Sequence, residues 1–428
     1  MSPLSSRLTA VRTRAARVRT RAARLLRFFK DLGPKAFLGR VFSKLSTQLS
    51  LQNAGGEMLV NLEHAAAVDW TVPGERFANP VTVADGPVRM AWIMSPPGAE
   101  SGGHQNLFRF IDFAERAGHH CTIYLYDNLH LTPSLDATKQ MLAASKSYPD
   151  LKADIRMYDA SVGVDADTQA LFATGWETAY ASYLDRSTAK RFYFVQDFEP
   201  YFYAIGSEYI LAENTYRFGF HGITAGGWLA HKLSTEYGMA CDSFDFSVDT
   251  SLYRITNERP RNEIFFYARP VTSRRAFELG VLALKDFSEL KPDVTINLAG
   301  WDVSGWDLPF AYKNHSSMQL AELNELYNRC AAGLVLSLTN MSLLPLELIS
   351  SGVAPVVNDG PNNRMVSDNQ FIEYVPPVPM ALARTLAGVF DRPDATARGL
   401  AMSASVAGAS WSDSGDAFVS AVERVMRG

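Results

Sequence analysis

Short apolar runs alternate with amphipathic runs along most of the chain, and this alternation limits the possible folds more than any other feature. Residues 88–95 (VRMAWIMS) and 294–300 (VTINLAG) are brief and mostly apolar, as expected of strands buried on both faces of a parallel sheet. Residues 228–238 and 273–290 carry apolar side chains at helical spacing. Repeated strand–helix units predict parallel sheets with helices packed on their faces.

The same criteria predict the remaining elements. Further strands are expected at residues 121–127, 154–159, 191–197, 221–226, 263–270, 332–338 and 353–359. Further helices are expected at residues 107–118, 168–185, 317–330, 344–352 and 380–390. A charged, proline-containing segment near residues 243–263 separates the two series and is typical of an interdomain connection. We therefore predict an α/β protein in which two doubly wound, Rossmann-like parallel-sheet domains face a cleft.

Length and composition agree with this division. A chain of 428 residues with 47% hydrophobic and 20% charged residues is globular and long enough for two or three domains. We assign residues 86–258 to an N-terminal domain and residues 259–405 to a C-terminal domain. Residues 45–85 are predicted to be a linker or collar, and residues 406–428 a helix that packs back on the N-terminal domain.

The cysteines and the hydropathy pattern argue against two other classes of protein. Three cysteines lie far apart and form no CxxC pair, which disfavours a disulfide framework or a cysteine-built zinc site and favours a reducing compartment. No stretch reaches about 18 apolar residues without a polar interruption. We therefore expect no membrane-spanning helix.

Residues 1–44 form a strongly basic extension. They contain twelve Lys or Arg residues and one acidic residue, Asp31. Their charge of +11, set against the net charge of −4, leaves −15 on the rest of the chain. Leucine, valine and phenylalanine recur among the arginines with partly helical spacing, so we predict an amphipathic helix that ends at Gly33 and Pro34.

Three interpretations of this extension stay open. A helix lying on an anionic membrane surface fits the mixture of arginine with leucine and phenylalanine. A solvated tail without a partner and a nucleic-acid-binding arm are the alternatives, although no nucleic-acid-binding module follows the extension. A secretory signal is excluded, because no apolar h-region follows the basic residues.

Polar segments follow several predicted strands, where doubly wound sheets bind their ligands. The first is PPGAESGGHQN (96–106), in which Gly102 and Gly103 precede a helix. Glycines let a ligand approach the backbone closely, and free helix N–H groups attract anions. The segment does not match GxGxxG and lacks the P-loop lysine, so a tight turn is the alternative. His104 is either a catalytic group or a hydrogen-bonding helix cap.

The second segment is FVQDFEPYF (194–202), which includes the end of an apolar strand. Gln196, Asp197 and Glu199 are predicted to form the edge of a site, and Asp197 and Glu199 share one side if the chain stays extended. A turn capped by the aspartate is the alternative. No third ligand accompanies the two carboxylates, so we expect no metal site.

The third segment is ARPVTSRR (268–275), which ends a strand and leads into a helix. Arg269, Arg274 and Arg275 converge on that helix start, with Thr272 between them. Arginine binds phosphate through a bidentate fork, and a helix N-terminus adds partial positive charge. We predict a diphosphate pocket here; a solvated run of charges is the alternative.

The fourth segment is SLTNMSLLPLELISSGVAPVV (337–357), where a strand ends in small hydroxyl and amide residues. Glu347 lies in the first turn of the following helix and is not expected to face the core unpaired. Its carboxylate can accept hydrogen bonds from sugar or ribose hydroxyls, or it is a glutamate favoured by the helix dipole. The donor-binding candidates in this segment are Thr339, Asn340, Ser342, Leu343, Leu344 and Glu347.

Four stretches carry a resemblance to a known family: MSPPGAESGGHQNLFRF, FVQDFEPYFYAIGSEY, ARPVTSRRAFELG and TNMSLLPLELISSG. In this order the chain resembles the retaining GT-B glycosyltransferases of glycosyltransferase family 4. It is more similar to the rhamnosyltransferases of bacterial rhamnan and S-layer glycan synthesis. The resemblance covers roughly residues 85–425. It implies transfer of a sugar from a nucleoside-diphosphate donor, with dTDP-rhamnose as the expected donor, retention of the anomeric configuration and no metal or other cofactor.

The resemblance also implies roles for individual residues. The family has two glutamates eight residues apart. In this chain Glu347 occupies the second position and Thr339 the first. The rhamnan-type subset is similar to this chain in having a small polar residue at the first position. The catalytic candidates are Asp197, Glu347 and His104, and Glu347 would orient ribose or sugar. Asp197 and the 102–104 loop would face the acceptor from the first domain, with Gln196 and Glu199 beside them.

The basic pair that holds the diphosphate in this family is an arginine followed by a lysine. Arg269 fits the first position. Arg274 or Arg275 replaces the lysine, which keeps the charge and changes the geometry. Lys313 is another candidate for this position.

The implied acceptor is a growing cell-surface polysaccharide or lipid-linked glycan. Such an acceptor would place the enzyme at the inner face of a bacterial cytoplasmic membrane, where the basic extension would hold it, with no nucleic-acid partner. Three other functions remain open: a transferase for a UDP- or GDP-linked hexose, a non-catalytic nucleotide-sugar-binding scaffold of a glycan assembly complex, and an epimerase of GT-B fold.

Overall fold

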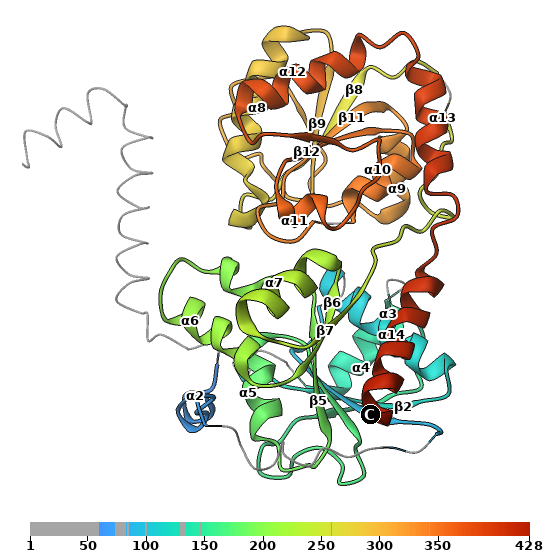
Figure 1. Ribbon diagram of the computed structural model, residues 1–428. Helices are drawn as coiled ribbons and strands as arrows, with labels where there is room; N and C mark the ends of the chain where they lie inside the picture. Colours follow the sequence, from blue (N-terminus) through green and yellow to red (C-terminus); the bar gives the residue numbers. More distant parts are fainter. Residues whose placement is uncertain are drawn as a thin grey trace, which may run out of the picture. The chain divides into compact units, whose positions relative to one another are not determined.

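The computed structural model describes residues 60–72, 83, 85–98, 101–128, 134–145, 148–257, 259–341 and 343–428. The predicted basic helix in residues 1–44 and most of the 45–85 segment lie outside these residues. In the part described, two parallel β-sheets each carry helices on their faces (Figure 1), which confirms the predicted α/β architecture.

The first sheet has seven strands in the order β3-β2-β1-β4-β5-β6-β7. The strands are β1 Arg89–Met94, β2 His120–Leu125, β3 Asp154–Met157, β4 Ala170–Ala173, β5 Lys190–Val195, β6 His221–Ala225 and β7 Cys241–Phe244. The helices are α2 Leu62–Ala67, α3 Gly102–Arg116, α4 Leu135–Ala144, α5 Trp176–Leu184, α6 Ser207–Asn214 and α7 Gly227–Tyr237. The strand order reverses between β1 and β4, so their carboxyl ends form the switch point at which such sheets bind ligands.

The prediction of a mostly helical 168–185 segment is wrong in its first half. Residues 170–173 form β4, a central strand that pairs with β1 on one side and β5 on the other. All of its side chains are buried. Alanine and leucine favour helices in isolation, but pairing and burial on both faces of a sheet override that preference. Gly175 is then the N-cap of α5.

Helix α3 begins five residues earlier than predicted. Ser101 is its N-cap, and its hydroxyl accepts a hydrogen bond from the His104 N–H at 3.5 Å. Hydroxyl side chains at this position satisfy N–H groups that have no partner within the helix. Gly102 and Gly103 therefore lie in the first turn of α3 at the end of β1, and they bring helical N–H groups to the switch point.

The second sheet has six strands in the order β10-β9-β8-β11-β12-β13. The strands are β8 Glu263–Tyr267, β9 Thr295–Ala299, β10 Lys313–Asn314, β11 Cys330–Val335, β12 Ala354–Asn358 and β13 Glu373–Val375. The helices are α8 Phe277–Leu290, α9 Leu320–Tyr327, α10 Leu344–Ser350, α11 Pro361–Arg364, α12 Pro379–Phe390 and α13 Ala395–Ser405. Here the order reverses between β8 and β11.

The last helix, α14 (Trp411–Arg427), belongs to the first domain in space although it ends the chain. It packs against α3 and β7 (Figure 1). Phe418 is 1% exposed and contacts an aromatic cluster, with its ring centroid 5.3 Å from that of Phe110 and 6.0 Å from that of Trp92. The chain therefore passes between the two domains twice, once after β7 and once before α14.

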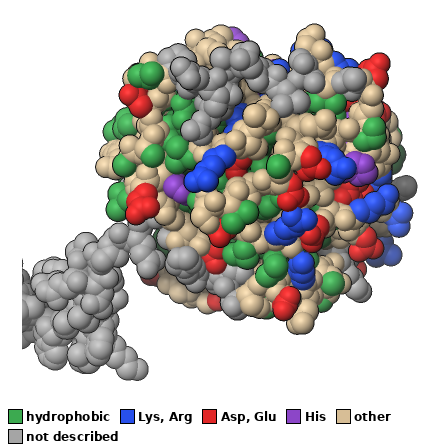
Figure 2. Space-filling view, turned by 90° about the horizontal axis from the view of Figure 1, so that it is seen from below, with side chains coloured by type: hydrophobic (Ala, Val, Ile, Leu, Met, Phe, Trp, Pro, Cys, Tyr) green, Lys and Arg blue, Asp and Glu red, His purple; other side chains and the backbone are tan. Residues whose placement is uncertain are grey.

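The surface of the first domain at the bottom of Figure 1 carries both signs of charge. Figure 2 shows acidic and basic side chains side by side over this face. Among the residues that the structure describes, no helix is long and apolar enough to cross a membrane. The three cysteines are free thiols.

Candidate functional site

A cavity of about 700 Å³ lies between the carboxyl ends of the two sheets. The first domain contributes residues that follow β1, β4 and β5, and the second domain contributes residues that follow β8, β9 and β11. Both switch points therefore open into the same space. Of the candidates predicted from sequence, the cavity brings together Gly102, Gly103, Gln196, Asp197, Glu199, Arg269, Arg274, Arg275, Leu343, Leu344 and Glu347.

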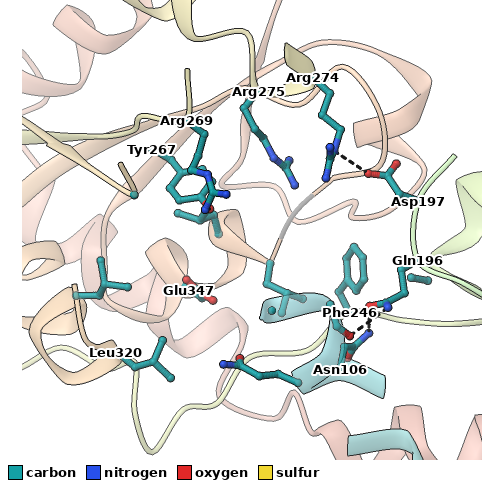
Figure 3. Close-up of a pocket in the computed structure, with 18 of the residues that line it drawn as sticks. Asn106, Gln196, Asp197, Phe246, Tyr267, Arg269, Arg274, Arg275, Leu320 and Glu347 are labelled. Atoms are coloured by element: carbon teal, nitrogen blue, oxygen red, sulfur yellow. Dashed lines mark hydrogen bonds and ion pairs between the residues drawn. The ribbon is translucent and has the colours of Figure 1, made fainter. Parts of the chain in front are cut away.

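Three arginines line the wall formed by the second domain (Figure 3). Arg275 donates from Nη1 to the Ser337 hydroxyl at 2.9 Å. Arg269 lies near an aromatic ring, with its guanidinium carbon 5.7 Å from the centre of Trp301, and within the described residues its Nε has no hydrogen-bond partner. A wall with three guanidinium groups fits a ligand that carries several negative charges, such as a diphosphate.

Local backbone geometry keeps two of these arginines out of the helix. The sequence predicts a helix from residue 273, but residues Ser273–Arg275 form a separate 3-10 turn and α8 begins at Phe277. Ala276, with φ 47°, adopts the left-handed conformation between them, which residues other than glycine rarely adopt. Arg274 and Arg275 therefore lie on a turn in the same segment as Arg269, between β8 and α8.

Glu347 lines the same cavity from the first turn of α10. Its Oε2 accepts a hydrogen bond from the Tyr327 hydroxyl at 3.4 Å. Burial raises the pKa of this carboxyl to about 7, against the smaller opposing effects of Tyr327 and Arg109. A carboxylate in this position can accept hydrogen bonds from the hydroxyl groups of a ligand.

We expect Glu347 to make the stability of the protein depend on pH. The folded protein holds the proton of this carboxyl more tightly than the unfolded chain, where the pKa is 4.5. The free energy of unfolding should therefore fall as pH rises through the window from 4.5 to about 7. Glu347→Gln should lack this component, while Glu278→Gln, which changes an exposed glutamate of α8, should retain it. Denaturant unfolding between pH 4 and pH 8 measures the difference, and a constant offset between wild type and Glu347→Gln would contradict the assignment.

The opposite wall ties the glycine-rich segment to the end of β5. Gln196 donates from Nε2 to the Gly103 carbonyl at 3.1 Å, and its Oε1 accepts from Asn106 Nδ2 at 3.2 Å (Figure 3). These bonds hold the first turn of α3 beside the polar residues that follow β5. The two segments that sequence analysis treated separately thus form one surface.

Asp197 and Glu199 were expected to share one side only if the chain stays extended. The chain does not stay extended, because Glu199 begins a 3-10 turn that runs to Phe202. The Glu199 carboxylate is 7% exposed and accepts from the Trp176 N–H at 2.6 Å and from the Tyr193 hydroxyl at 3.1 Å. Burial, and then the neighbouring Glu177, raise its pKa well above the ordinary value.

Asp197 instead reaches the second domain. Its carboxylate accepts hydrogen bonds from the Thr339 hydroxyl and from the Asn340 N–H, both at 2.9 Å. Thr339 and Asn340 are buried in this contact rather than placed on the cavity wall. Thr272 lies in the turn before α8, where its carbonyl accepts the Arg275 N–H at 2.9 Å.

Two further candidates lie away from the cavity, and one lies outside the described residues. His104 binds Ser101 through Nδ1 and the Ser95 carbonyl through Nε2, both at 2.9 Å, so Nε2 carries the proton. Burial lowers the pKa of this ring. Lys313 is on β10, at the edge of the second sheet, 3.6 Å from Glu263. Ser342 falls outside the residues that the structure describes.

Sequence reasoning missed Arg109, which lines the cavity from α3 of the first domain. It donates to Asn106 Oδ1 at 3.1 Å, and its guanidinium carbon lies 4.1 Å from the centre of the Trp411 ring. The available signal was an arginine that interrupts the apolar run LFRFIDF directly after the glycine-rich segment. Other lining residues that were missed include Asn106, Trp176, Glu177, Tyr203, Phe246, Tyr253, Tyr267, Leu320 and Tyr327.

Among the described residues, no three His, Cys, Asp or Glu side chains come close enough to hold a metal ion.

Two family models match parts of the chain. The model described as WsaF, C-terminal domain, matches residues 262–387, and the model described as WsaF, N-terminal domain, matches residues 154–225. The O-antigen biosynthesis protein RfbC of Myxococcus xanthus is 32% identical over 319 residues, which cover 71% of this chain and 25% of that protein. The chain thus spans about a quarter of the length of this curated relative.

Solved structures share the fold over about four fifths of this chain. A Staphylococcus aureus TarM mutant, in complex with Fondaparinux, alpha-GlcNAc-glycerol and UDP, is similar with a TM-score of 0.61 at 7% identity, over 80% of this chain and 100% of that chain. Anabaena Alr3699/HepE, in complex with UDP and glucose, is similar with a TM-score of 0.56 at 14% identity, over 79% of this chain and 98% of that chain. The fold is GT-B.

Proposed function

We propose that this chain transfers L-rhamnose from dTDP-rhamnose to a hydroxyl group of a growing cell-surface polysaccharide or lipid-linked glycan. The observation that carries the proposal is the set of Arg269, Arg274 and Arg275 on one wall of the cavity that Glu347 also lines. The WsaF models and the O-antigen relative support a role in polysaccharide synthesis. The choice of rhamnose rests on the resemblance in the four sequence stretches.

In the proposed reaction the bond between the anomeric carbon and the diphosphate oxygen breaks. The acceptor hydroxyl oxygen forms the new bond to that carbon, and its proton passes to the leaving diphosphate. Negative charge builds up on the leaving diphosphate. Guanidinium groups already oriented toward that position stabilise this charge without reorganisation. The arginines supply the charge compensation, so we propose that transfer needs no metal ion.

Glu347 is proposed to accept hydrogen bonds from hydroxyl groups of the donor ribose or sugar. The first-domain wall, with Gln196, Glu199 and the first turn of α3, is proposed to hold the acceptor. The cavity has walls from both domains, so a closed arrangement limits the access of water, which would otherwise hydrolyse the donor. We propose retention of the anomeric configuration, on the resemblance alone.

We also propose that the enzyme acts at the inner face of a bacterial cytoplasmic membrane. The support is the +11 charge of residues 1–44 and the presence of leucine and phenylalanine among the arginines.

Thermal stabilisation by nucleotides tests the donor assignment. A ligand at about 100 times its Kd adds roughly 2.7 kcal/mol to the free energy of unfolding. We expect dTDP and dTDP-rhamnose to raise Tm, and Arg269→Ala to reduce the rise because it removes a charge from the proposed diphosphate site. Arg384→Ala, which changes an exposed arginine of α12, is the matched control.

The panel separates the competing functions. A rise with UDP- or GDP-linked sugars and none with dTDP-rhamnose would overturn the rhamnose assignment and keep a transferase. No rise with any nucleotide would overturn the transferase proposal. A rise with dTDP-rhamnose but no turnover in the presence of a rhamnose-terminated acceptor would identify a nucleotide-sugar-binding scaffold. Conversion of the donor without an acceptor, to another nucleotide sugar, would identify an epimerase.

A further inference from the structure

The side chain of Asp197 is engaged mainly by the second domain. Oδ1 accepts the Asn340 N–H at 2.9 Å and Oδ2 accepts the Thr339 hydroxyl at 2.9 Å, and Arg274 Nε lies 3.3 Å from Oδ2. Oδ1 also accepts the N–H of the next residue, Phe198, at 2.8 Å. Both oxygens are therefore bound to protein groups.

Asn340 makes the reciprocal connection. Its side-chain Nδ2 donates to the Gln196 carbonyl at 3.0 Å and to the Ala225 carbonyl at 2.7 Å, at the ends of β5 and β6. Asn340 is 2% exposed and Thr339 is 1% exposed. Buried polar groups that lose their partners cost free energy, so this contact strongly favours the arrangement of the two domains that satisfies it.

The same contact is connected to the proposed diphosphate arginines. Ser337 donates to the Asn340 carbonyl at 2.6 Å and accepts from Arg275 Nη1 at 2.9 Å. The Leu338 N–H donates to the Arg274 carbonyl at 2.9 Å. Arg274 also lies over a first-domain ring, with its guanidinium carbon 4.1 Å from the centre of Phe202.

We propose that Asp197, Thr339, Asn340 and Arg274 form an interdomain clasp, in which Asp197 is a positioning residue rather than a group that touches the reacting atoms. Figure 3 shows Asp197 turned toward Arg274 at the edge of the cavity. The clasp holds the two domains together at the end of β5 and fixes the orientation of Arg274. Opening the domains would break the Asp197–Arg274 ion pair, so domain closure and the geometry of the arginine wall change together.

Two substitutions outside the cavity wall test the clasp. Asn340→Ala removes the bonds to Gln196 and Ala225, and Thr339→Val removes one bond to Asp197 while it keeps the side-chain shape. The distance between spin labels at Ile205→Cys in the first domain and Leu282→Cys in the second reports on closure, because these positions are 91% and 52% exposed. Cys241→Ser removes the partly exposed native thiol from the background.

We expect Asn340→Ala to give a longer and broader distance distribution than wild type, and Thr339→Val a smaller change in the same direction. Asn369→Ala is the matched control, because the Asn369 side chain bonds Ser405 within the second domain, and it should leave the distribution unchanged. Unchanged distributions in both clasp variants would overturn the proposal. The measurement needs no nucleotide, so it does not depend on the proposed donor.

Measurement of donor turnover shows whether Asp197 is a positioning residue or a catalytic residue. This second test rests on the proposed function. If Asp197 is a positioning residue, Asn340→Ala should lower the kcat for donor turnover at least ten-fold, while the Kd for the donor nucleotide should change less than three-fold. If Asp197 acts on the substrate, Asp197→Asn should lower kcat and Asn340→Ala should leave it near wild type, which would overturn the clasp as the role of Asp197. Should Asp197→Asn fail to fold, the Asn340→Ala and Thr339→Val results still decide.

Discussion

Arg275→Ala should lower the turnover of the nucleotide-sugar donor by about 10²–10³-fold, the loss typical when one group that stabilises developing negative charge is removed. Arg275 lines the cavity, and its Nη1 is held by the Ser337 hydroxyl at 2.9 Å. This fixed partner orients the guanidinium before a ligand arrives. The side chain is therefore the arginine of the wall whose position is best defined within the second domain.

Release of the nucleoside diphosphate in the presence of a rhamnose-terminated acceptor measures this effect. Arg275→Lys should recover part of the rate, because it restores the charge without the two-pronged geometry. Arg384→Ala, on the exposed face of α12, should leave the rate unchanged. If Arg275→Ala keeps a rate within three-fold of wild type, the proposal that the arginine wall stabilises the leaving diphosphate is contradicted.

Phe418→Ala should lower the free energy of unfolding by about 3–5 kcal/mol, the range measured for removal of a buried phenylalanine side chain. Phe418 is 1% exposed, and its ring lies 5.3–6.3 Å from the rings of Trp92, Phe110, Phe172 and Phe194. The substitution leaves a cavity between α14 and the sheet of the first domain. It also weakens the attachment of the last helix.

Chemical denaturation, followed by a signal from the aromatic cluster, measures this loss. Val419→Ala changes the neighbouring, partly exposed residue of the same helix and should cost less than about 1 kcal/mol. An equally small loss in Phe418→Ala would show that α14 does not contribute to the core of the first domain in solution.

The sequence predicted the two-sheet architecture because buried parallel strands are short apolar runs, and helices between them have a different periodicity. The resemblance implied that Arg269, Arg275 and Glu347 share a donor site. The structure places all three on the wall of one cavity, where they follow the neighbouring strands β8 and β11. Strand β4 was missed because three of its four residues, two alanines and a leucine, are good helix formers. Only its pairing with β1 and β5 distinguishes a strand from a helix here.

The interdomain contacts could not be predicted in the same way. Asp197 and Asn340 are separated by 143 residues, and no local pattern connects them. The extended geometry assumed after β5 failed because the proline after Glu199 accompanies a 3-10 turn, which buries Glu199 and leaves Asp197 at the domain boundary. Arg109 was missed because a single arginine within an apolar helix can have several roles. Only the position of the second domain shows that this side chain lines the cavity.

The position of α14 affects how the chain folds as it is made. Translation completes β7, the last strand of the first sheet, long before the 17 residues of α14 are synthesised. Until then the nascent first domain has no helix to cover the side of Trp92 and Phe110 on which Phe418 lies, and uncovered apolar surface of this kind is prone to aggregation. A stop codon before or within the segment that encodes α14 would therefore damage the first domain, whose sheet is encoded more than 150 residues earlier.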